Sequence, residues 1–198
     1  GGPSAVPTEV ETDLLSLGVD EVFRVAGEDR FATAAAVATA LGTEPLPPEI
    51  QHCDDPSVID GDARMGFYAN AVIEMRLSST SCQLLEKTVV LADGIAGADA
   101  LAAGWWTSFW QVPVLLHDGS SQLPAATSTA LQTLDIANLV VLGGTSRISE
   151  DVATQAQKLA GADLHRIAGS DRYDTSIQMA QKLGGWWPTG RADEFTSS

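Results

Sequence analysis

Five arginines are the side chains of this sequence whose type and spacing best fit a chemical role. Arg24, Arg30, Arg166 and Arg172 stand at matching positions of two similar decapeptides, and Arg147 follows a pair of glycines. A guanidinium can bind a phosphate or a carboxylate through two parallel hydrogen bonds. These residues therefore indicate a surface that binds an anion.

An alternative use of the same arginines is structural. The Asp-Arg dipeptide is itself repeated, with Asp29 before Arg30 and Asp171 before Arg172. Ion pairs between these arginines and neighbouring carboxylates at an interface between modules fit the pattern equally well.

Glycine-rich turns follow three of the predicted strands. Parallel strands end at one edge of a sheet, where the backbone N–H groups and positive dipole ends of the following helices can hold phosphate or carboxylate. Each glycine alone is also explained by a tight turn. There is no G-x-G-x-x-G or G-x-x-x-x-G-K-[ST] motif, so nucleotide binding has little support. With the arginines above, the predicted polymer-binding set is completed by Gly27, Gly94, Gly97, Gly143, Gly144 and Thr145.

Acidic and imidazole side chains offer weaker patterns. Asp93 and Asp99 flank "GIAGA" and could hold a metal ion, but a carboxylate at a helix start more simply meets the helix dipole. His52, His117 and His165 lie far apart, without the context of a catalytic triad. We therefore predict no catalytic residue, no metal ligand and no cofactor.

The chain alternates short apolar runs with longer helical patterns. Unbroken Val/Leu/Ile runs separated by helices are typical of a parallel sheet covered on both faces. The pattern predicts an α/β fold, Rossmann-like in outline. The predicted strands are 20–27, 87–93, 112–118, 137–144 and 164–169, and the predicted helices are 29–42, 96–110, 124–135, 149–162 and 171–185.

The decapeptides "RVAGEDRFAT" and "RIAGSDRYDT" are an internal repeat, with six of ten positions identical. We expect a polar lead over 1–20 and a module over 21–170 with an insertion at 43–87. The start of a second, truncated repeat follows at 171–198. A helix is predicted around Met65 to Leu77, inside the insertion. The second copy stops where its next strand is due, so either the chain is a piece of a longer protein or the partial copy completes the sheet of the first module.

The balance of charge excludes several partners. The chain has 198 residues, 44% hydrophobic content and a net charge of −15. This charge opposes general attraction to nucleic acid or to an anionic membrane. The apolar runs are too short to span a bilayer. The first residues lack the layout of a signal peptide, so an export signal was removed or was never part of this chain.

Two cysteines stand in the insertion, Cys53 and Cys82, with no metal-binding spacing around them. A disulfide closing this loop would stabilise the fold by roughly 3 to 4 kcal/mol and favours an extracellular setting. Two unrelated buried thiols are the alternative.

Aromatic residues concentrate in one predicted helix. Trp105 with Phe109, and Trp106 with Trp110, form two i, i+4 pairs. Indole rings can stack on sugars, but so many in one helix favour packing between modules.

Five separated motifs, in order, carry a family resemblance: "RVAGEDRFAT", "VVLADGIAGADALAA", "PVLLHDGSSQLPAATSTAL", "LVVLGGTSRISEDV" and "HRIAGSDRY". The chain resembles the type 2 cell-wall-binding repeat of Gram-positive surface proteins, in about one and a half copies. The resemblance implies a Rossmann-like or toprim-like three-layer fold with a mainly parallel sheet. It also implies three tandem copies packed as a trimer, and noncovalent attachment to anionic wall polymer.

We therefore predict a secreted, non-catalytic module that binds the carbohydrate polymer of the cell wall and other copies of its own repeat. One alternative is a metal-dependent or nucleotide-using enzyme on the same scaffold. The other is an oligomerisation module.

Overall fold

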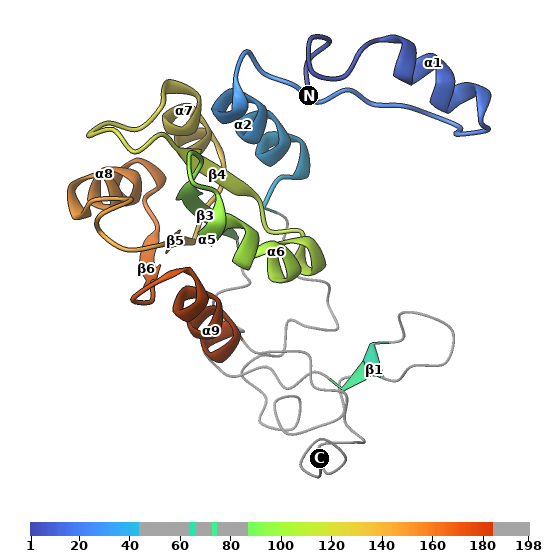
Figure 1. Ribbon diagram of the computed structural model, residues 1–198. Helices are drawn as coiled ribbons and strands as arrows, with labels where there is room; N and C mark the ends of the chain where they lie inside the picture. The colour runs from blue at the N-terminus through green and yellow to red at the C-terminus, as the bar shows by residue number, and fades with distance from the viewer. Residues whose placement is uncertain (44–63, 66–72, 75–86, 184–198) are drawn as a thin grey trace.

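A sheet of four parallel strands forms the centre of the structure (Figure 1). The structure is a computed structural model, and it describes residues 1–43, 64–65, 73–74 and 87–183. The strands of the sheet are β3 (Thr88–Asp93), β4 (Val114–His117), β5 (Asn138–Leu142) and β6 (Asp163–Ile167), in the order β4-β3-β5-β6. All four strands were predicted from the sequence. The α/β class and the parallel sheet are therefore confirmed.

Helices cover both faces of this sheet (Figure 1). One face packs against α2 (Arg30–Leu41), α7 (Ala125–Thr133) and α8 (Glu150–Ala160), and the other against α5 (Ala98–Ala102), α6 (Gly104–Trp110) and α9 (Arg172–Leu183). The result is three layers with one apolar core on each side of the sheet.

The central strand β3 shows why the sequence builds two cores. All six of its residues are buried, with Val89 and Leu91 in the core under α2, α7 and α8, and Val90 and Ala92 in the core under α6 and α9. Successive side chains of a strand point to opposite faces of the sheet. A continuous apolar run is what a strand buried on both faces requires.

The first predicted strand, at residues 20–27, is wrong, because no strand forms there. By the internal repeat, Arg24 corresponds to Arg166, so this segment is the counterpart of β6. In this chain β6 already pairs with β5, from Asn138 opposite Asp163 to Leu142 opposite Ile167. The position beside β5 that residues 21–25 would take in the sheet is thus filled by β6, the corresponding segment of the second repeat.

The predicted helix over 96–110 is interrupted. It divides into α5 and α6 at Ala103, which is fully buried, and Gly104 follows directly. Glycine has low helix propensity, so a break at this point is inexpensive.

The predicted polar lead contains a helix, α1 (Glu9–Ser16), that has no buried residue. It lies apart from the sheet in Figure 1. The Arg24 guanidinium ties this segment to the body, because it pairs with the Glu11 carboxylate and donates hydrogen bonds to the carbonyls of Gly1 and Val6.

Between the ends of the insertion at Thr43 and Lys87, the described pieces are β1 (Arg64–Met65) and β2 (Ile73–Glu74), which pair antiparallel. The helix predicted around Met65 to Leu77 is wrong at these residues, because their backbone groups pair across two strands. Cys53 and Cys82 lie outside the described residues, so their disulfide stays a prediction. No helix in the described part of the chain is long and apolar enough to cross a membrane.

Candidate ligand-binding edge

The strands β3 to β6 all end at one edge of the sheet, which we call the carboxyl edge. The turn after β3 is joined to the end of β4, because the Gly94 N–H donates to the His117 carbonyl at 2.8 Å. The turn after β5 is joined to the end of β6 in the same way, from the Gly143 N–H to the Ile167 carbonyl at 2.9 Å. Two of the three glycine turns singled out in the sequence, those of Gly94 and Gly143, therefore lie along a single edge, whereas Gly27 follows no strand in this structure.

Two of the predicted arginines brace the turns of this edge. Arg30 Nη1 donates to the Gly94 carbonyl at 3.0 Å, and Arg166 Nη1 donates to the Gly143 carbonyl at 2.8 Å. Arg166 Nε also lies 3.2 Å from the Glu150 carboxylate. These guanidiniums fix backbone turns, which corresponds to the structural alternative for the arginines.

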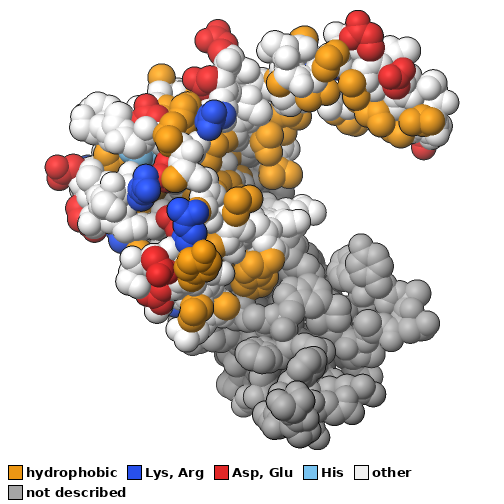
Figure 2. All heavy atoms as spheres, in the orientation of Figure 1, with side chains coloured by type: hydrophobic (Ala, Val, Ile, Leu, Met, Phe, Trp, Pro, Cys, Tyr) orange, Lys and Arg blue, Asp and Glu red, His pale blue; other side chains and the backbone are white. Residues whose placement is uncertain are grey.

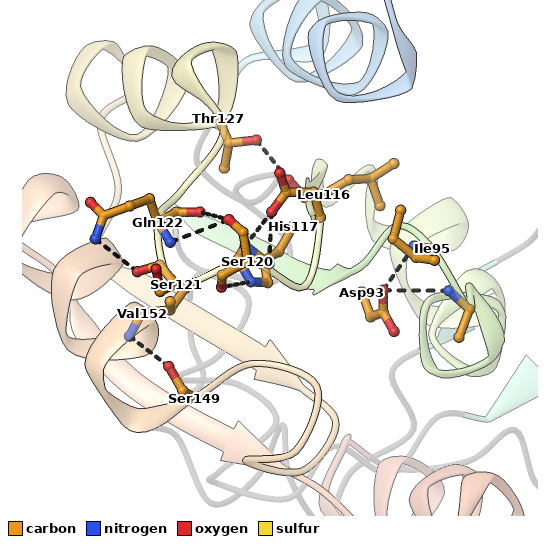
Figure 3. A network of polar contacts seen from close by, with 12 residues as sticks. Asp93, Ile95, Leu116, His117, Ser120, Ser121, Gln122, Thr127, Ser149 and Val152 are labelled. Atoms are coloured by element: carbon orange, nitrogen blue, oxygen red, sulfur yellow. Dashed lines mark hydrogen bonds and ion pairs between the residues drawn. The ribbon is translucent and has the colours of Figure 1, made fainter.

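Arg147 is placed differently. Its side chain is 53% exposed, and Nη1 lies 3.7 Å from Oδ2 of the buried Asp93, beyond hydrogen-bond distance. Asp93 in turn accepts the Ile95 N–H at 2.8 Å, which closes the turn after β3 (Figure 3). Arg147 thus has donors available to an external anion, and Gly144 and the exposed Thr145 stand beside it in the same loop.

The other two arginines separate. Arg24 is engaged with α1 and lies in the connection to the polar lead. Arg172 is exposed at the first residue of α9, and no partner of its guanidinium is found within the described parts of the chain. The sequence repeat therefore does not give its two copies equal surroundings.

The repeated decapeptide proves to be a helix-start motif. The Gly27 N–H donates to Thr33 Oγ1 at 3.0 Å, and the Gly169 N–H donates to Thr175 Oγ1 at 3.1 Å. Asp29 accepts the Ala32 N–H at 2.7 Å, as an N-cap does. A Cβ on Gly27 would lie 2.6 Å from the Thr33 nitrogen. The residues that are identical in the two copies thus form a close approach between backbone segments and a cap at the start of the helix.

Several backbone N–H groups of the carboxyl edge already donate hydrogen bonds to carboxylates and hydroxyls of the chain. Asp171 Oδ1 accepts from Tyr173 and Asp174, and Ser149 Oγ accepts the Val152 N–H at 3.3 Å (Figure 3). The first turn of α8 also carries Glu150 and Asp151. The basic side chains are thus better placed than these N–H groups to receive an anion.

A polar network that the sequence did not indicate follows β4. His117 is fully buried opposite Asp93 in the sheet register, and its Nε2 lies 3.1 Å from the Ser120 carbonyl (Figure 3). Hydrogen bonds from the Ser120 side chain and backbone N–H lower the pKa of the neighbouring Asp118 carboxyl. The available sequence signal was the His117-Asp118 pair directly after an apolar run. The bonds from Ser120 favour the charged form of the Asp118 carboxyl beside the edge.

Metal ligation has no support in the described residues, which hold no group of three or more His, Cys, Asp or Glu side chains placed to share an ion. Asp93 binds backbone N–H groups of its own turn. Asp99 lies close against Gly143: a Cβ on this glycine would stand 2.6 Å from Asp99 Oδ2, so the absence of a side chain there makes room for the carboxylate.

The structure is thus a three-layer α/β body with repeated helix starts and a glycine-lined carboxyl edge. The family model for cell wall binding domain 2 matches residues 24–153, so the chain belongs to the cell wall binding domain 2 family. The resemblance seen in the sequence is confirmed, and so is the expected location, secreted or in the cell wall.

One curated relative is similar to part of the chain. The N-acetylmuramoyl-L-alanine amidase LytC of Bacillus subtilis (strain 168) is 35% identical over 118 residues, which are 59% of this chain and 22% of the amidase. The chain thus spans about a fifth of that relative's length.

Two solved structures share the fold. Cwp8 from Clostridium difficile matches with a TM-score of 0.58 at 23% identity, over 92% of this chain and 23% of that chain. Cwp6 from the same organism matches with a TM-score of 0.52 at 21% identity, over 82% of this chain and 20% of that chain.

Proposed function

We propose that this module anchors a secreted or surface protein to an anionic polymer of the cell wall, without catalysing a reaction. Membership of the cell wall binding domain 2 family supports binding to the wall. The nature of the polymer is argued from the carboxyl edge, where cationic donors stand although the chain as a whole carries a net charge of −15.

The observation that carries this proposal is the half-exposed guanidinium of Arg147. It stands beside Gly144 and Thr145, and its carboxylate neighbour Asp93 is too distant for a hydrogen bond. Charge-assisted hydrogen bonds to a phosphate or carboxylate are stronger than neutral ones. The other members of the predicted set shape the edge: Arg30 and Arg166 hold the turns of Gly94 and Gly143.

Figure 2 shows how a strongly acidic chain can present such a site. Basic side chains lie along the visible face of the α/β body, interspersed with acidic ones, rather than in one large patch. Contacts of this kind are screened by salt, with a Debye length of about 8 Å at physiological ionic strength. We therefore expect wall binding to weaken steeply as salt is raised.

The direct test is sedimentation of the 198-residue chain with purified cell walls, before and after the walls are stripped of phosphate- and carboxylate-bearing polymers. Loss of binding on stripped walls supports the proposal. Undiminished binding to stripped walls would contradict it.

A pair of variants locates the contact. Arg147→Ala removes the half-exposed guanidinium and should weaken wall binding about tenfold, the effect of losing one or two charge-assisted hydrogen bonds. Lys158→Ala is the matched control, because it makes the same change of charge in the last turn of α8, at the opposite edge of the sheet. Equal effects of the two variants would point to general charge attraction instead.

Association with other copies is part of the same proposal. The internal repeat supports an arrangement of several modules, which we propose to be a trimer. The hypothesis that competes with wall anchoring is a metal-dependent or nucleotide-using enzyme on the same scaffold. Binding to stripped walls together with turnover of a nucleotide or phosphoester would favour it.

A further inference from the structure

The two helices that follow the repeated decapeptides bury opposite faces. In α2 the buried residues are Ala35 and Ala38, which pack in the core with β4 and α7. In α9 the buried apolar residue is Met179, which packs in the other core with Ile167 of β6. The same motif thus uses one side of its helix in the first copy and the other side in the second.

The residue correspondence makes the exchange explicit. Ala35 and Ala38 of α2 correspond to Ile177 and Ala180 of α9, and both of these are exposed. Met179 of α9 is fully buried, whereas its counterpart in α2, Val37, is 39% exposed. Each helix therefore carries two apolar faces and has a partner for only one of them in the described structure.

The outward face of α9 is an ordered stripe. Tyr173, Ile177 and Ala180 follow the i, i+4, i+7 spacing of one helix face, and Tyr173 and Ile177 are 75% and 53% exposed. Large apolar side chains grouped on one exposed face usually mark an interaction site.

The first copy shows what such a stripe contacts. Phe31, the counterpart of Tyr173, lies against the turn at Gly94, where a Cβ would lie 2.9 Å from the Phe31 ring. Arg30, the counterpart of the exposed Arg172, donates to the carbonyl of the same glycine. Ala35 and Ala38 then cover β4 and α7.

We infer that the stripe of Tyr173, Ile177 and Ala180 is the docking face for a second module of this kind, in which α9 takes the place that α2 holds here. The helix is then shared: its Met179 side closes the core of this module, and its Ile177 side closes the core of the next. Arg172 would brace the glycine turn after the next module's β3, as Arg30 braces Gly94.

The start of the chain fits the same arrangement from the other side. Residues 21–25 correspond to β6 but have no place in this sheet, and Val37 and Leu41 of α2 are exposed. In a preceding module this segment would pair with a strand equivalent to β5. Arg24 would then donate to a glycine carbonyl, as Arg166 does to Gly143.

This inference supplies the contact faces for the association of copies proposed above, but its test measures folding and not wall binding. The test compares the 198-residue chain with a tandem chain in which residues 1–183 are followed by residues 42–198. Gly42 corresponds to Gly184 in the repeat, so the junction follows α9 at the point where the chain continues after α2. The α9 of the first module is thus followed by the strands of a second module. Because the enthalpy of unfolding scales with the number of folded residues, the tandem chain should show about 1.7 times the calorimetric enthalpy of the single chain.

The decisive variant is Ile177→Asp at one of two places in the tandem chain. In the helix between the modules it should unfold the second module and reduce the enthalpy by about 40%, to that of the single chain. In the last α9 of the same chain, and in the 198-residue chain, it should shift Tm by less than about 2 °C, because Ile177 is exposed there. Equal effects at the two places would overturn the inference, and so would a tandem chain with no more enthalpy than the single chain.

Discussion

Arg147 and Asp93 face each other across the carboxyl edge, with 3.7 Å between Nη1 and Oδ2. The two side chains come from different loops, the arginine from the turn before α8 and the aspartate from the end of β3. Asp93 is 4% exposed and accepts the N–H groups of Ile95 and Ala96. Its negative charge is thus held by the backbone of its own turn, which leaves Arg147 to meet solvent.

Removing the Asp93 carboxylate should therefore destabilise the fold rather than abolish a reaction. Asp93→Ala leaves the Ile95 N–H without its acceptor in a part-buried turn, which costs about 1 to 3 kcal/mol of unfolding free energy. Urea denaturation measures this loss. Asp163→Ala, at the exposed start of β6, makes the same change of charge and should alter stability by less than about 0.5 kcal/mol.

The repeated glycines should be intolerant of a side chain. A Cβ on Gly27 would lie 2.6 Å from the Thr33 nitrogen, and one on Gly169 would lie 2.6 Å from the Asp174 Cβ. Because backbone of the helix start must shift, Gly27→Ala and Gly169→Ala should each cost about 2 kcal/mol or more, within the range of overpacked sites.

Gly104 is the control for this prediction. It begins α6, and a Cβ there would meet nothing within 4 Å. Gly104→Ala should leave stability unchanged or raise it by up to about 1 kcal/mol. If all three glycine variants behaved alike in thermal unfolding, the close-approach argument would fail.

Trp106 belongs to the core of the module. Its side chain is fully buried with Val90, Val140 and Met179, on the face of the sheet that α9 covers. Trp106→Ala should cost about 3 to 5 kcal/mol, the usual loss for a large aromatic in a core. Leu101→Ala, at an exposed position of the neighbouring α5, should change the free energy of unfolding by less than about 0.5 kcal/mol.

The regular part of the fold could be predicted from the sequence because its signals are local. The run "TVVLAD" gives a buried strand, and Ser149 before "EDVATQAQKLA" gives a capped helix, as the structure shows. Periodicity and capping depend on neighbours in the chain, so they can be read from it.

Non-local competition explains the main failures. Nothing in "DEVFRVAG" itself prevents a strand, but β6 occupies the only position beside β5 that its counterpart would fill. Trp106 was assigned to packing between modules because a helical pattern does not reveal which face a helix buries. For the same reason, the sequence did not predict that α2 and α9 bury opposite faces.

The candidate site was predicted only in outline. The alignment of the glycine turns after β3 and β5 at one edge follows from parallel strands, and the structure has it, but the strand expected before Gly27 does not form. Which arginine is free to bind depends on side-chain partners far away in sequence, such as Glu11 for Arg24 and Gly94 for Arg30. Those partners could not be read from the repeat.

The start of α9 should respond to acid through Asp174. The backbone N–H of Ser170 donates to Asp174 Oδ2 at 2.7 Å, and this hydrogen bond, with those of the Ser170 and Gln178 side chains, lowers the pKa of the carboxyl below its ordinary value of 3.8. A carboxyl whose folded pKa is lowered stabilises the fold above its unfolded pKa, and this stabilisation is lost as pH falls through the folded pKa. Asp174→Asn should therefore lower Tm near pH 7, and its difference from the parent chain should shrink below about pH 4. Thermal unfolding of both chains between pH 7 and pH 2.5 measures this, with Asp163→Asn giving the effect of the charge change alone. A Tm difference that stayed constant over the whole pH range would show that the hydrogen bond to Ser170 does not depend on the ionised carboxylate.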